Sequence, residues 1–80
     1  MNYTYNRSWE EIEDMLNLAE QEQNYHHTEG LSSTDREDKI YHARNYKALQ
    51  GVVKTLRWVL GDKLIEHPLE WLIWDIIKKP

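Results

Sequence analysis

The feature that most constrains this fold is a run of positions, spaced alternately three and four residues apart, along the first third of the chain. The repeating positions are Trp9, Ile12, Leu16, Ala19, Gln23 and His26. This spacing is typical of one face of an α-helix. Ser8-Trp9-Glu10-Glu11 has the form of a capping box, in which a serine hydroxyl and a glutamate carboxylate accept from backbone amides. The pattern predicts a helix over residues 8–27.

A second helix is predicted over residues 34–60. Thr34-Asp35-Arg36-Glu37 has the form of another capping box, and Gly61 is suited to the C-terminal end. Its apolar face would hold His42, Tyr46, Leu49, Val53, Leu56 and Leu60. We expect residues 28–33 to form a loop, with Gly30 as a left-handed stop. Because that loop is short, the two helices should form an antiparallel hairpin.

A third, tryptophan-rich helix is predicted over residues 68–79, because proline suits the first turn of a helix. Its main face would hold Leu69, Leu72, Ile73, Ile76 and Ile77, with Trp71 and Trp74 to one side. These side chains exceed what a small hairpin can cover, which favours self-association. The expected fold is therefore a single all-α domain, residues 1–80, that forms a homo-oligomer with interface residues Trp71, Trp74 and Ile77.

Composition limits the possible functions. A chain of 80 residues buries a thin core, and the absence of cysteine excludes disulfides and thiolate metal sites. The formal net charge of −4 argues against general nucleic-acid binding. The sequence shows no signal peptide and no apolar run of membrane-spanning length. We expect a cytoplasmic protein that does not contact membranes.

The histidines are the first candidates for chemistry. His26, His27 and His42, with Glu29 nearby, could meet at the hairpin turn and hold a zinc-like ion. Their spacing matches no metal signature, and the favoured interpretation is that His26 and His42 are polar members of the core, hydrogen-bonded to each other or to Tyr46. We predict neither a metal nor a cofactor. Since no catalytic motif is present, we also predict that the chain is not an enzyme.

A basic stripe on the second predicted helix is the strongest candidate for a ligand site. It comprises Arg44, Lys47, Gly51, Lys54 and Trp58, which fall on one side of the helix away from its apolar face. The cations suit phosphate, the tryptophan could stack on a base, and the glycine permits close approach. The alternative is that Gly51 marks a helix crossing and that the cations pair with acidic residues 10–22 or face solvent.

The segment 43–61 resembles the last helix of many short bacteriophage proteins and is similar to the anti-CBASS cyclic-nucleotide sponges. The shared elements are Arg44, the tripeptide Leu49-Gln50-Gly51, and Leu56-Arg57. The resemblance implies a small helical protein that oligomerises and sequesters a nucleotide signal of host immunity.

Together these features predict a non-enzymatic phage-type accessory protein that counters host defence by binding. Its ligand would be a phosphate-bearing nucleotide second messenger, held at the basic stripe. The alternative is a protein–protein inhibitor or adaptor that binds a host defence protein through its tryptophan-rich tail and acidic first helix.

Overall fold

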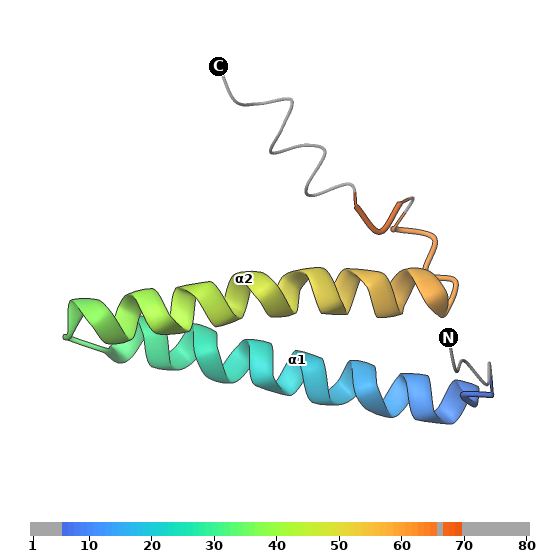
Figure 1. The fold of residues 1–80 in the computed structure, drawn as a ribbon, viewed down its shortest axis with the longest axis horizontal. Helices are drawn as coiled ribbons and strands as arrows, with labels where there is room; N and C mark the ends of the chain where they lie inside the picture. The colour runs from blue at the N-terminus through green and yellow to red at the C-terminus, as the bar shows by residue number, and fades with distance from the viewer. Residues whose placement is uncertain (1–5, 66, 70–80) are drawn as a thin grey trace, which may run out of the picture.

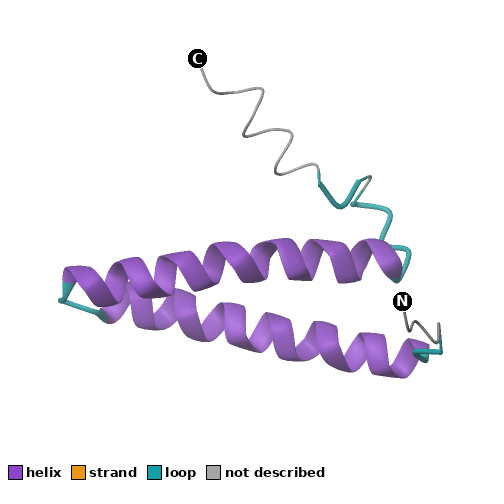
Figure 2. Cartoon of the chain, viewed as in Figure 1, coloured by secondary structure: helices purple, strands orange, loops and turns teal. Residues whose placement is uncertain are grey.

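The structure is an antiparallel pair of long helices. The computed structural model describes residues 6–65 and 67–69. Helix α1 comprises Trp9–Ser32 and helix α2 comprises Arg36–Val59, and the two lie side by side along their length (Figures 1 and 2). The predicted all-α helical hairpin is therefore confirmed. Within the described residues, no helix is long and apolar enough to cross a membrane.

The start of α1 follows the predicted capping box. The Ser8 hydroxyl accepts from the Glu11 amide at 3.1 Å, and the Glu11 carboxylate accepts from the Ser8 amide at 3.2 Å. Arg7 adds an ion pair to Glu11 at 3.0 Å. The hydrogen bond from the Ser8 amide, followed by that from Arg7, holds the pKa of Glu11 below its ordinary value. Glu11 therefore remains ionised, and the cap intact, in mildly acidic solution.

The predicted end of α1 at residue 27 is wrong, because the helix continues to Ser32. Gly30 was expected to stop the helix, but it lies within it. A Cβ atom on Gly30 would lie 3.3 Å from the Cβ of His42. The missing side chain thus serves close packing against α2 rather than a left-handed turn. The Ser32 hydroxyl donates to the Thr28 carbonyl at 3.1 Å within this last turn.

The predicted second capping box is also wrong. The N-cap of α2 is Asp35, whose carboxylate accepts from the Glu37 amide at 3.3 Å. Because α1 is five residues longer than expected, the connection between the two helices is shorter than predicted and comprises residues 33–35. Asp35 then becomes the last extended residue before α2, in place of Thr34.

The end of α2 agrees with the predicted role of Gly61. Leu60 is the C-cap, and Gly61 has φ +85°, the left-handed conformation that glycine adopts without strain. The Asp62 amide donates to the Arg57 carbonyl at 2.9 Å, and the Gly61 amide donates to the Trp58 carbonyl at 3.1 Å. This pair of bonds forms a Schellman motif.

The interface between the two helices is thin. Of the described residues, those buried are Ala19, His26 and Val53, and each of them keeps a small exposed fraction. An ion pair from Arg57 to Glu20 also joins the helices, so the acidic helix meets the basic one at this point. The predicted third helix, residues 68–79, lies outside the described residues from residue 70 onward, and Pro68 and Leu69 form a turn.

We predict that Gly61→Ala lowers the free energy of unfolding by about 1 kcal/mol, because a left-handed backbone strains any residue with a Cβ atom. No atom lies within 4 Å of the position that this Cβ would occupy, so steric crowding adds nothing. Urea unfolding measures the difference. Gly61→Asn should cost less than Gly61→Ala, since asparagine tolerates this conformation better. Equal stability of the alanine variant and the wild type would contradict the assignment.

Candidate ligand-binding hollow

A hollow of about 410 Å³ lies between the two helices near the hairpin turn. We call it the turn hollow. Helix α1 contributes four of its lining residues and α2 contributes five: His26, His27, Gly30, Leu31, Lys39, His42, Ala43, Tyr46 and Lys47. The lining therefore combines two lysines with aromatic and small side chains. No carboxylate belongs to it.

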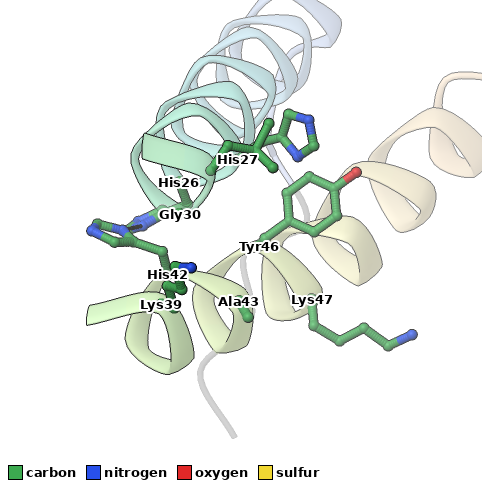
Figure 3. A pocket seen from close by; sticks show the side chains of 9 residues that line it. His26, His27, Gly30, Lys39, His42, Ala43, Tyr46 and Lys47 are labelled. Atoms are coloured by element: carbon green, nitrogen blue, oxygen red, sulfur yellow. Dashed lines mark hydrogen bonds between the residues drawn. The ribbon is translucent and has the colours of Figure 1, made fainter. Parts of the chain in front are cut away.

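Helical periodicity brings these residues together. Lys39, Ala43 and Lys47 are spaced by four residues, so they lie along one side of α2, and Tyr46 lies beside them. Gly30 lets α1 approach α2 closely at this point. Figure 3 shows His27 and Tyr46 facing each other from the two helices, with the Lys47 side chain extending away from them. The ring centroids of His27 and Tyr46 are 5.3 Å apart.

A pair of histidines forms the inner edge of the turn hollow. The Nδ1 atoms of His26 and His42 are 2.9 Å apart, so one ring donates a hydrogen bond and the other accepts it. The rings of Tyr25 and Tyr41 contact this pair edge-on, at centroid separations between 5.0 and 5.9 Å. The sequence favoured a hydrogen bond from His26 and His42 to each other or to Tyr46, and the structure has the first of these.

Metal binding gains no support from the arrangement. Among residues 6–65 and 67–69, no three histidine, aspartate or glutamate side chains gather closely enough to hold an ion. His27 contacts Tyr46 rather than the histidine pair. The carboxylate of Glu22 lies 4.0 Å from Nε2 of His26, on the ring nitrogen that does not face His42.

The five residues of the predicted basic stripe all lie on α2, but three of them line three different hollows. Lys47 lines the turn hollow, while Arg44 lines a second one beside Glu37 and Tyr41. Gly51 lines a third, together with Pro68 and Leu69. Trp58 is 48% exposed, and Lys54 is half-buried. The predicted interface residues Trp71, Trp74 and Ile77 lie outside the described residues.

Sequence reasoning missed most of the turn hollow. Of its lysines only Lys47 was selected, while Lys39 and Tyr46 were assigned no role in ligand binding and His27 was considered only as a metal ligand. The pattern Lys39, Ala43, Lys47 was a usable signal, because a small residue between two lysines on one helix face leaves room for an anion. Gly30 was the other residue that could have indicated this hollow. Its sequence neighbours do not show what packs against it, and the structure places His42 there.

Comparisons with known proteins identify no relative: no protein-family model, curated protein or solved structure matches this chain.

The hydrogen bond between His26 and His42 predicts that an apolar side chain at position 42 destabilises the hairpin. His42→Leu would leave the buried ring of His26 without its partner on α2, which should lower the free energy of unfolding by about 1–3 kcal/mol. Urea unfolding measures the effect.

His42→Gln should cost less than His42→Leu, because the glutamine amide can still hydrogen-bond to His26. His67→Leu, at an exposed histidine of the connecting segment, is the matched control and should change the free energy of unfolding little. Equal stability of His42→Leu and the wild type would rule out the explanation.

Proposed function

We propose that this protein is a non-enzymatic binding protein that sequesters a phosphate-bearing nucleotide at the turn hollow. The observation that carries the proposal is the lining of this hollow. Lys39 and Lys47 stand on the same helix side as the ring of Tyr46, and no acidic side chain lines the space. In a chain with a formal net charge of −4, such a local excess of positive charge favours an anionic ligand.

The two lysines supply the phosphate-binding chemistry. Lysine ammonium groups form charge-assisted hydrogen bonds with phosphate oxygens, and these bonds are stronger than neutral ones. Lys39 and Lys47 are both exposed, so their flexible side chains can turn toward a bound anion. Their separation of eight residues, roughly 12 Å along a helix, suits a ligand with more than one phosphate.

The aromatic rings supply a surface for the base. The rings of Tyr46 and His27 contact each other, with their centroids 5.3 Å apart. A base would therefore stack against the outer face of one ring rather than between the two rings. Leu31 and Ala43 complete an apolar wall. Mixed apolar walls with a few polar groups are typical of small-molecule sites.

The sequence resemblance supports a specific class of ligand and a cellular role for this binding activity. The segment 43–61 is similar to phage proteins that sequester cyclic nucleotides of host immunity, and a binding protein without catalytic groups suits that role. We therefore place the proposed ligand among cyclic oligonucleotide signals, and the proposed role in the host cytoplasm as an anti-defence factor.

The proposal predicts that Lys39→Ala weakens nucleotide binding by tenfold or more, because one charge-assisted contact contributes about 1.5–3 kcal/mol. Isothermal titration with cyclic dinucleotides, cyclic trinucleotides and AMP measures the affinity, and thermal melting with the same compounds reports binding to the folded state. Lys47→Ala should have a similar effect.

Lys54→Ala separates the turn hollow from the basic stripe. Lys54 belongs to the stripe but does not line the turn hollow, so its loss should leave binding unchanged. If Lys54→Ala weakens binding and Lys39→Ala does not, the ligand site is the stripe. If none of these nucleotides binds the wild type, the proposed function is wrong.

Self-association through the tail is the second part of the proposal. The hairpin buries few residues, and a second copy adds the apolar contacts that a chain of this size needs. The side chains proposed for this contact are Trp71, Trp74 and Ile77.

We expect Trp71→Glu to shift the protein toward monomer in sedimentation, because a charge in an apolar interface costs several kcal/mol. Helix content by circular dichroism should survive the change. Trp58→Glu, at an exposed tryptophan of α2, is the matched control and should leave the sedimentation unchanged. A wild-type protein that sediments as a monomer at high micromolar concentration would exclude this interface.

A further inference from the structure

The side of α2 that faces away from α1 carries a stripe of mostly small or apolar residues. We call it the outer stripe and define it by six residues: Tyr41, Arg44, Ala48, Gly51, Val52 and Thr55. At about 100° per residue, all six fall within about a third of the circumference of α2, opposite the buried residue Val53. Hollows lie along the stripe. Tyr41 and Arg44 border one of about 380 Å³, and the other four residues border one of about 410 Å³.

Two polar side chains on this side of α2 are hydrogen-bonded within the helix itself. The Thr55 hydroxyl donates to the Gly51 carbonyl at 2.9 Å, and the Asn45 amide donates to the Tyr41 carbonyl at 2.8 Å. Covering these side chains with another segment would therefore leave neither donor unpaired. The lack of a side chain at Gly51 also lets a covering segment approach closely.

The described chain after α2 lies against the outer stripe. Pro68 and Leu69 line the same hollow as Gly51 and Thr55. Figure 1 shows this segment, in orange, on the side of α2 opposite α1. The chain leaves α2 at its C-cap, Leu60, and by Leu69 has turned back toward the middle of the helix. The residues that follow therefore start at the outer stripe.

We propose that residues 70–77 continue along the outer stripe as a helix antiparallel to α2. Helical spacing is present in the apolar residues of this segment, which are Leu69, Leu72, Ile73 and Ile76. In a helix these residues share one side, and Ile76 lies roughly 10 Å beyond Leu69, near the level of Arg44. Trp71 and Trp74 lie on the other side of such a helix and stay available for the proposed self-association.

Charge favours α2 over α1 as the surface that this segment covers. Residues 70–77 carry Glu70 and Asp75 and no basic residue. Helix α1 carries acidic residues and no basic one, so it would repel the segment. From residue 44 to its C-terminal end, α2 has the opposite charge, with four basic residues and no acidic one: Arg44, Lys47, Lys54 and Arg57.

The order of charges along the two segments also agrees. In the antiparallel arrangement Asp75 lies close to the level of Arg44, and Lys78 and Lys79 follow toward the acidic first turn of α2. A second hairpin is a poorer occupant, because two outer stripes placed face to face would bring the basic residues of both copies together.

Disulfide trapping in the full-length chain tests the proposal, and the natural absence of cysteine makes the background clean. The double variant Ala48→Cys with Ile73→Cys should form a disulfide within one chain under mild oxidation, because the antiparallel helix brings the two Cα atoms within bridging distance. The matched control is Asn24→Cys with Ile73→Cys. Asn24 is also exposed, but it lies on the side of α1 that points away from α2 and should remain unlinked.

Gel mobility without reductant distinguishes the outcomes. A monomer with a disulfide in the Ala48 variant, and none in the Asn24 variant, supports the proposal. A covalent dimer from the Ala48 variant overturns it, because a second copy then supplies the occupant. Equal linking of both variants, or no disulfide in either, also overturns it.

Charge reversal gives an independent readout by thermal melting. Arg44→Glu should lower the melting temperature by about 2–4 °C, because it places a second carboxylate beside Asp75. Asp75→Lys should then raise the melting temperature of Arg44→Glu but lower that of the wild type. Asp14→Lys, at an exposed aspartate on the side of α1 away from α2, is the matched control and should shift both backgrounds equally. An equal shift of both backgrounds by Asp75→Lys overturns the proposal.

Discussion

The arrangement of this hairpin depends on the close approach of α1 and α2 at Gly30. A side chain there would press on His42, so the glycine sets the separation of the helices at the turn end. That separation brings Nδ1 of His26 within hydrogen-bond distance of His42 and satisfies the buried polar ring. It also leaves the space beside His27 and Tyr46 that becomes the turn hollow. The packing of the helices, their buried polar contact and the candidate site therefore all depend on the lack of a side chain at Gly30.

Much of the fold follows from local signals in the sequence, and the errors have a common cause. The Ser8 capping box and the Gly61 stop were predictable because a few adjacent residues determine each. Gly30 and Thr34 were misassigned because their roles depend on contacts with the other helix or on the length of α1. A glycine near the end of a helix can serve as a stop or as a packing site, and its sequence neighbours do not distinguish the two.

The candidate site was harder to predict than the fold for a similar reason. On a single helix, a lysine of a binding site looks the same as an ordinary surface lysine. It becomes part of a site only where a second helix forms the opposite wall of a hollow. Lys47 was selected as part of a stripe along α2, whereas the hollow groups it with Lys39 on the same helix and with His27 on α1. Periodicity describes one helix at a time, so it identified residues that share a face of α2 and missed those that face each other across the pair.

The short connection of residues 33–35 has a consequence for how the hairpin forms. Contacts beside it, such as Gly30 with His42, close a small loop and therefore cost little chain entropy. Contacts farther from the turn, such as Glu20 with Arg57, join residues much farther apart in the chain. Folding should accordingly nucleate at the turn, and contacts between α1 and α2 should then form progressively toward the open end. The histidine pair and the turn hollow should therefore form before the contacts at the open end.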